Sequence, residues 1–204
     1  MFEVTIVNIL SNIWPMVVIF TVILASFRIV YIKKYQEEFV LYKEVLKLGF
    51  IIYILSLFYV VTFQDVSWST SNFIPFKEMF RYRPGSFLFL KNVIGNMIMF
   101  MPYGFFISYF LKADKKSTII YLGIIVSLTI EVTQLIIGRV FDVDDIILNI
   151  LGGLIGYYIY KFIYIIKSHL PEFFKKNIVY DIIVIGILIL VFWYLYKIMW
   201  LGVY

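Results

Sequence analysis

The segment EVTQLIIGRVFDVDDIILN, residues 131–149, places four carboxylates, one arginine and two amides in an otherwise apolar stretch. Carboxylates at this density can serve as general acid and base, bind Mg²⁺ through their oxygens, or face a cation. If the protein is an enzyme, we expect Glu131, Asp142 and Asp145 to carry the chemistry, with Asp142 and Asp145 as Mg²⁺ ligands. A charged side chain at the centre of a membrane helix costs about 2.5 to 3.5 kcal/mol even on mild insertion scales, so the segment predicts a functional site.

Long apolar helices are the elements that must position these residues. The 204-residue chain is 63% hydrophobic and 15% charged, a composition typical of a membrane protein. The apolar runs are continuous, and a helix of about 20 residues spans the roughly 30 Å hydrocarbon core of a bilayer. The sequence therefore predicts an all-α, polytopic helix bundle forming a single membrane domain, 1–204. The six predicted spans are residues 13–31, 48–63, 93–111, 119–137, 146–166 and 178–200. The second is expected to extend backwards over Leu46 and Lys47.

The distribution of Lys and Arg residues predicts how the spans are oriented. Cytoplasmic connections of membrane proteins are enriched in these residues. Twelve of them lie in the connections on one side and five on the other, which predicts a multi-pass protein with both termini outside. Since the basic residues flank the spans, the net charge of +5 indicates topology and predicts no nucleic-acid partner. The five on the outer side are Lys77, Arg81, Arg83, Lys91 and Arg139.

Polar residues of three consecutive spans are expected to meet in one shallow layer, because the spans alternate in direction. Within each set the residues lie three or four positions apart, so each set forms a stripe on one helix face. The sets are Asn92 with Asn96, Glu131 with Gln134, and Asp142 with Asp145 and Asn149. On this spacing Asp144 points elsewhere, and we expect it to face solvent. Below the layer, Gly152, Gly153 and Gly156 predict a surface that another helix can approach closely.

Three motifs in this chain resemble the VanZ-like family of membrane proteins. They are NFIPF at 72–76, NVIGNMIMFMPYGF at 92–105, and the segment 131–156, which ends in ILGGLIG. The resemblance covers about 48–166 and leaves a helix at each end, 13–31 and 178–200, outside it. The founding member of the family is associated with bacterial resistance to the glycopeptide antibiotic teicoplanin. The resemblance therefore implies a role in glycopeptide or cell-envelope resistance and a location in the bacterial cell membrane.

The polar layer has two interpretations. It is either an outward-facing cavity that binds a ligand, or a structural network in which Arg139 pairs with Glu131 or Asp142 and the amides bridge helices. Because one arginine neutralises only one acid, the remaining carboxylates favour the cavity. The residues predicted to bind the ligand are Asn72, Asn92, Asn96, Glu131, Gln134, Arg139, Asp142, Asp145 and Asn149.

Three functions fit these expectations. The first is a non-enzymatic resistance protein, without a cofactor, whose cavity binds an envelope component or the drug. The second is an intramembrane enzyme acting on a lipid-linked cell-envelope substrate, in which Mg²⁺ offsets the excess negative charge. The third is a lipid carrier or flippase, suggested by Pro102 within the third span. The expected partners are the lipid bilayer and either a lipid-linked cell-wall intermediate or a glycopeptide, and the sequence predicts no oligomeric state.

Overall fold

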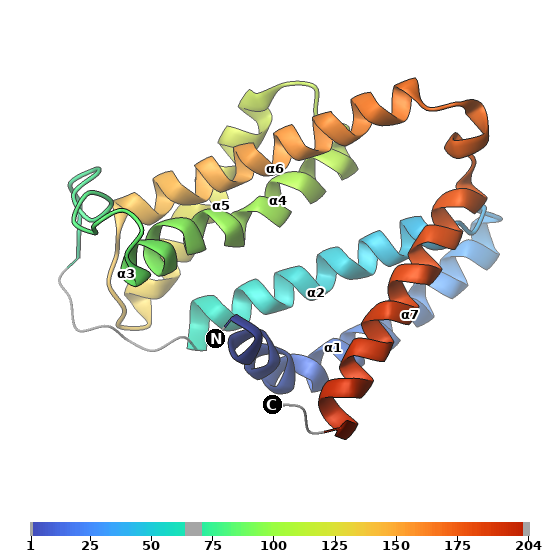
Figure 1. The fold of residues 1–204 in the computed structure, drawn as a ribbon, viewed down its shortest axis with the longest axis horizontal. Coiled ribbons are helices and arrows are strands. Elements are labelled where there is room, and N and C mark those ends of the chain that lie inside the picture. The colour runs from blue at the N-terminus through green and yellow to red at the C-terminus, as the bar shows by residue number, and fades with distance from the viewer. Residues whose placement is uncertain (1, 64–70, 202–204) are drawn as a thin grey trace.

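Within the residues that the computed structural model describes, 2–63 and 71–201, six helices are long and apolar enough to cross a membrane. They are α1 (Phe2–Tyr35), α2 (Leu41–Phe63), a helix over Phe87–Leu111, α5 (Lys116–Ile136), α6 (Val143–His169) and α7 (Asn177–Leu201) (Figure 1). The predicted all-α, multi-pass architecture is confirmed. The second span begins at Leu41, so the expected extension over Leu46 and Lys47 is confirmed. Helix α1 is longer than the predicted 13–31.

The helix over Phe87–Leu111 is not uniform. It consists of α3 (Phe87–Phe89), the π-helical turn η1 (Leu90–Ile94) and α4 (Gly95–Leu111), which continues through Pro102. Ser86 caps its start, because the Ser86 hydroxyl accepts a hydrogen bond from the Phe89 N–H at 3.2 Å. A π-helical turn inserts one extra residue into the turn, and such turns are frequent at functional sites. Here the turn carries Asn92, which the sequence places in the polar layer.

Helices α4 and α6 pack with their backbones in direct contact (Figure 1). A Cβ atom on Gly104 of α4 would lie 1.8 Å from the carbonyl oxygen of Gly153. Cβ atoms on Gly152 and Gly156 of α6 would lie 2.2 and 2.0 Å from carbonyl oxygens of α4. No side chain fits at these three positions, so glycine is what allows the two helices to come so close. The predicted small-residue surface is confirmed, and Gly104 completes it from the other side.

A small core joins α2 to α4 beneath the polar layer. On α2, the Tyr53 hydroxyl donates a hydrogen bond to the carbonyl oxygen of Met99 on α4 at 3.0 Å, which satisfies this polar group in apolar surroundings. The buried members of this core are Leu57, Val61, Phe100 and Tyr103. These contacts hold the end of α2 beside the first turns of α4.

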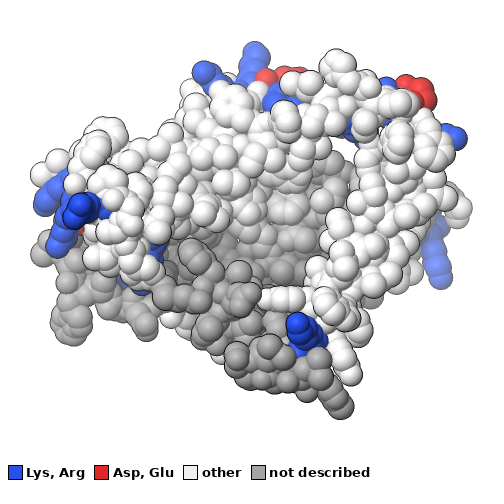
Figure 2. All heavy atoms as spheres, viewed as in Figure 1, with Lys and Arg blue, Asp and Glu red and all other residues white. Residues whose placement is uncertain are grey.

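Helices α1 and α7 lie at the periphery of the bundle (Figure 1). Arg28 ties α1 to α2 through hydrogen bonds of 2.9 and 3.1 Å to the Glu44 carboxylate. Asp181 ties α7 to α2 by accepting the Tyr42 N–H at 2.8 Å. Large apolar side chains of both helices remain exposed, as a surface in contact with lipid requires. In Figure 2 most of the charged atoms drawn in colour lie toward the left end and the upper and right edges of the visible face.

Candidate functional site

The NFIPF motif, residues 72–76, lies against the loop that leads into α6. The Asn72 N–H donates to the Phe141 carbonyl at 2.8 Å, and the Val143 N–H donates to the Asn72 carbonyl at 3.1 Å, forming a short parallel bridge. The Asn72 side-chain amide donates to Asp142 Oδ1 at 2.9 Å. Asn72 is buried behind Asp142. From there it holds the loop in place and orients the Asp142 carboxylate.

Asp144 anchors the rest of this loop. Its Oδ1 accepts the Phe76 N–H at 2.5 Å, and its Oδ2 accepts the N–H groups of Glu78 and Met79 at 2.8 and 3.0 Å. Asp144 is only 1% exposed, so the expectation that it faces solvent is wrong. The loop folds back over the first turn of α6 and supplies three donors to the carboxylate, an arrangement that helical spacing alone cannot reveal.

Glu131 and Asp142 are joined at the end of α5 and the start of α6. Glu131 is 1% exposed, and its Oε2 accepts the Asp142 N–H at 2.8 Å. Asp142 in turn caps α6, because its Oδ1 accepts the Asp144 N–H at 2.9 Å. Burial raises the pKa of Asp142, and its hydrogen bonds from Asn72 and the Asp144 N–H act in the opposite direction. Hydrogen bonds therefore link Glu131 to Asp142 and Asp142 to Asp144.

Two asparagines connect the helices beneath these acids. Asn96 of α4 donates to Asp145 Oδ1 of α6 at 2.5 Å. Asn149 of α6 donates to the Ser127 hydroxyl of α5 at 2.8 Å. Asn149 is 2% exposed, and its Oδ1 has no hydrogen-bond donor among the described residues. Ser127 is absent from the sequence-based prediction, although its place four residues before Glu131 on the same helix face could have revealed it.

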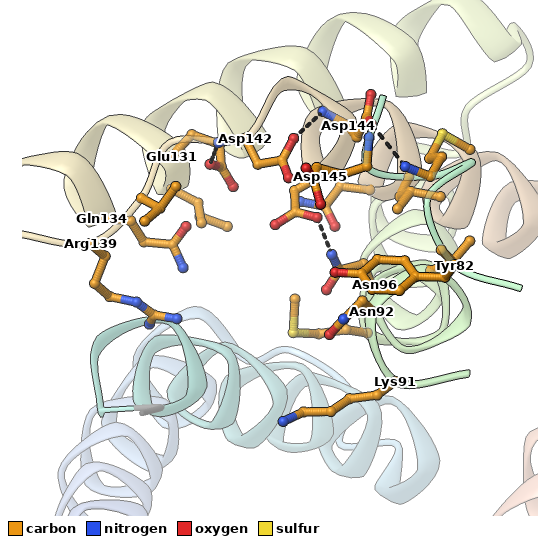
Figure 3. A pocket seen from close by; sticks show the side chains of 18 of the residues that line it. Tyr82, Lys91, Asn92, Asn96, Glu131, Gln134, Arg139, Asp142, Asp144 and Asp145 are labelled. Carbon is orange, nitrogen blue, oxygen red and sulfur yellow. Dashed lines mark hydrogen bonds between the residues drawn. The ribbon is translucent and has the colours of Figure 1, made fainter. Parts of the chain in front are cut away.

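These side chains surround a cavity of about 670 Å³ at the end of the bundle where α4 and α6 begin and α5 ends. The carboxylates of Glu131, Asp142 and Asp145, here called the acidic wall, lie on one side of the cavity in Figure 3. Lys91 and Arg139, here called the basic wall, lie on the opposite side. Of the nine predicted ligand-binding residues, the structure brings eight together around the cavity, and their binding role stays a prediction. These eight are Asn92, Asn96, Glu131, Gln134, Arg139, Asp142, Asp145 and Asn149.

In the part of the chain that the structure describes, Arg139 does not form the ion pair with Glu131 or Asp142 that the structural-network interpretation predicts. Its guanidinium instead donates to the backbone carbonyl oxygen of Val61 on α2. The cause is the end of α5, where Gly138 adopts a φ of +82° and the Arg139 N–H returns to the Gln134 carbonyl at 2.8 Å. This left-handed residue turns the chain, so Arg139 reaches α2 across the cavity from the acids.

The charges that line the cavity do not balance. Arg81 pairs with Glu78 at 3.0 Å, and the remaining charged side chains that line the cavity among the described residues are four acids and two cations. They are Glu131, Asp142, Asp144 and Asp145 against Lys91 and Arg139. With every group ionised, the cavity therefore carries an excess of negative charge and attracts cations.

The candidate Mg²⁺ ligands Asp142 and Asp145 both line the cavity, and each uses one oxygen to accept a hydrogen bond from an asparagine amide. Among the described residues, no group of three or more His, Cys, Asp or Glu side chains is arranged to hold a metal ion. A Mg²⁺ ion at this place stays a prediction.

Comparison with known proteins places the chain in a family. No curated protein and no solved structure matches it. A family model described as VanZ/LLP1 matches residues 50–165, more than half of the chain and every residue that lines the cavity. The chain therefore belongs to the VanZ/LLP1 family.

Proposed function

We propose that this protein is a non-enzymatic protein of the bacterial cell membrane that contributes to resistance to glycopeptides such as teicoplanin. In this proposal its cavity faces outward and binds an envelope component or the drug, which reduces productive drug binding. The observation that carries the proposal is the convergence of polar side chains from η1, α4, α5 and α6 on one cavity with an unbalanced charge. Membership of the VanZ/LLP1 family supports it.

The hydrogen bonds of the cavity favour ligand binding over a purely structural network. A structural network uses its polar atoms internally, as Asn72 and Asp144 do. The acidic wall behaves differently: Glu131 and Asp145 each use one carboxylate oxygen, and the other oxygen has no donor among the described residues. These second oxygens are not among the buried atoms without a partner, so they are accessible from the cavity and can accept hydrogen bonds from a ligand.

Drug susceptibility tests the proposal. In cells that make the wild-type protein, we expect Glu131→Gln, Asp145→Asn or Arg139→Gln to lower the inhibitory concentration of teicoplanin and leave that of vancomycin unchanged. A loss of about 1.4 kcal/mol in binding free energy corresponds to a roughly tenfold decrease in affinity. The control is Asp114→Asn, because the Asp114 side chain is 92% exposed and lies outside the cavity. Unchanged teicoplanin resistance in all three variants, at equal protein levels in the membrane, contradicts the proposal.

The proposed orientation has a separate test. The chain has no cysteine, so single cysteines can be introduced without background. In intact cells we expect a membrane-impermeant thiol reagent to label Arg83→Cys, in the loop beside the cavity, and to leave Asp114→Cys unlabelled. Both positions are exposed, so a difference in labelling reports the side of the membrane. Labelling of Asp114→Cys alone reverses the proposed orientation and places the cavity inside the cell.

An intramembrane enzyme acting on a lipid-linked substrate is the second candidate. It is favoured by the presence of Glu131, Asp142 and Asp145 on one side of the same cavity, where they could act as acid and base or hold Mg²⁺. Turnover of polyprenyl phosphates by the purified protein, dependent on a divalent ion and lost in Asp142→Asn, distinguishes this candidate from a binding protein.

A further inference from the structure

We propose that the cavity recognises a primary ammonium group attached to a phosphodiester, the chemistry of an ethanolamine phospholipid headgroup. The ammonium group lies against the acidic wall and the phosphodiester lies against the basic wall. This inference rests on the proposed function, in which the cavity binds an envelope component, and it names the class of that component.

The acidic wall offers acceptors that the protein leaves unused. The hydrogen bonds of the described residues occupy Oε2 of Glu131, Oδ1 of Asp142 and Oδ1 of Asp145. The second oxygen of each of these carboxylates has no donor among the described residues. Glu131 lines the cavity, and its second oxygen is not among the buried atoms without a partner, so this oxygen is accessible from the ligand space. Asn149, at 2% exposed, adds an Oδ1 atom that also lacks a donor in this part of the chain.

A primary ammonium group complements these acceptors. It carries one positive charge and three N–H donors, and the acidic wall presents three carboxylate oxygens that accept no hydrogen bond from the described residues. A trimethylammonium group carries the same charge and has no N–H donor, so it satisfies none of these oxygens by hydrogen bonding. A hydroxyl group has a single donor and no charge. The acidic wall therefore distinguishes a primary ammonium group from both alternatives.

The basic wall supplies the complementary site for an anion. Figure 3 shows Lys91 and Arg139 across the cavity from the carboxylates. The hydrogen bond from Arg139 to the Val61 carbonyl orients its guanidinium, and its other N–H groups have no acceptor among the described residues. A guanidinium group suits the oxygens of a phosphate through paired hydrogen bonds, and a lysine adds a point charge. The two walls together are complementary to a zwitterion that places its cation against the acidic wall and its anion against the basic wall.

The position of the cavity indicates a lipid as the source of this zwitterion. The cavity lies where spans α4, α5 and α6 begin or end, beneath the loop that Asp144 holds. In a bilayer, the ends of spanning helices lie at the depth of the lipid headgroups. A headgroup in the surrounding bilayer therefore reaches this level without leaving the membrane.

Lipid binding to the purified full-length protein tests the inference. Native mass spectrometry in detergent can compare phosphatidylethanolamine, phosphatidylcholine and phosphatidylglycerol with identical acyl chains. We expect phosphatidylethanolamine to bind about tenfold more tightly than the other two, the ratio that corresponds to one additional charge-assisted hydrogen bond. Glycerophosphoethanolamine, which has no acyl chains, distinguishes a lipid from a free aminoalkyl phosphate as the ligand.

Variants separate the two walls. Glu131→Gln and Asp145→Asn should abolish the preference for phosphatidylethanolamine over phosphatidylcholine. Arg139→Gln should instead weaken the binding of both lipids equally. Asp114→Asn should leave all affinities unchanged, because Asp114 lies outside the cavity. Preferences are ratios measured on one sample, so partial unfolding of a variant does not produce the expected pattern.

Four outcomes overturn the inference. Equal binding of the three lipids contradicts the assignment of an ammonium group. Binding of Mg²⁺ in the absence of lipid, if it depends on Glu131 and Asp145, contradicts it as well. If a polyprenyl pyrophosphate or phosphatidylglycerol is preferred, and the same variants weaken it, the ammonium assignment fails while the proposed binding of an envelope component stands. If no envelope lipid binds and the variants retain teicoplanin resistance, the proposed function fails as well.

Discussion

Replacing Gly156 with alanine should force α4 and α6 apart and cause a large loss of stability. The new Cβ atom would lie 2.0 Å from the Met101 carbonyl oxygen and 2.7 Å from the Phe105 nitrogen, both backbone atoms that no side-chain rotation can move away. Overpacking of a well-packed interior usually costs about 1 to 3 kcal/mol, and we expect at least the upper value here. For a chain of this size, roughly 3 kcal/mol lowers the melting temperature by about 6 to 12 °C.

Gly153→Ala is the matched control for this substitution. It adds the same methyl group to the same helix, three residues away, where the nearest atom outside the helix would be in the Ile119 side chain at an ordinary 3.6 Å. Thermal unfolding of the detergent-solubilised protein, followed by loss of monodisperse protein on heating, measures both variants. Equal melting temperatures for Gly156→Ala and Gly153→Ala would show that α4 and α6 do not meet as described.

Asp144→Asn should release the loop that contains the NFIPF motif. The carboxylate accepts three backbone N–H groups, and an amide replaces one of its acceptor oxygens with a donor. Hydrogen bonds to a charged group contribute about 1.5 to 3 kcal/mol each, so losing one should raise the open fraction of the loop roughly ten- to hundredfold. Hydrogen–deuterium exchange of the Phe76, Glu78 and Met79 amides measures this opening directly.

Asp114→Asn again provides the comparison, since it removes an equivalent charge from an exposed side chain that contacts Lys161 at 3.3 Å. In the Asp114→Asn variant, the loop amides should exchange hydrogen for deuterium at the wild-type rate. Trypsin offers a second measurement, because Lys77, Arg81 and Arg83 lie in the loop and should be cleaved faster in Asp144→Asn. If the three amides exchange at the wild-type rate in Asp144→Asn, the carboxylate is not what holds the loop.

Much of the fold follows from the sequence because a membrane protein has few ways to satisfy its backbone. Continuous apolar runs of the right length specify helices, and alternating direction then brings Asn96, Glu131 and Asn149 to the same end of the bundle. Gly152 and Gly156 likewise predict a close helix contact, since no side chain fits at these two positions, whereas a methyl group on Gly153 would meet only the Ile119 side chain at an ordinary distance. These inferences need only helical geometry.

The site details that sequence reasoning missed depend on loops. Asp144 has the spacing of an exposed first-turn residue, and only the returning loop provides the three donors that bury it. Arg139 looks like a partner for a neighbouring acid, and the left-handed Gly138 turns it toward the Val61 carbonyl instead. Helical spacing gives no information about such chain reversals. The π-helical turn at Leu90–Ile94 is equally invisible to a count based on 3.6 residues per turn.

The backbone contact between α4 and α6 has a consequence for how the cavity meets its ligand. Movement of α4 along α6 would bring backbone atoms at these glycines into steric clash, so we expect the hydrogen-bonded pair Asn96 and Asp145 to keep its geometry whether the proposed ligand is present or absent. On this expectation the acids are preorganised, and little reorganisation energy has to be spent when a ligand binds. Helix α2 is held to α4 by side chains such as Tyr53, and we expect it to be the element that adapts to the size of a bound group.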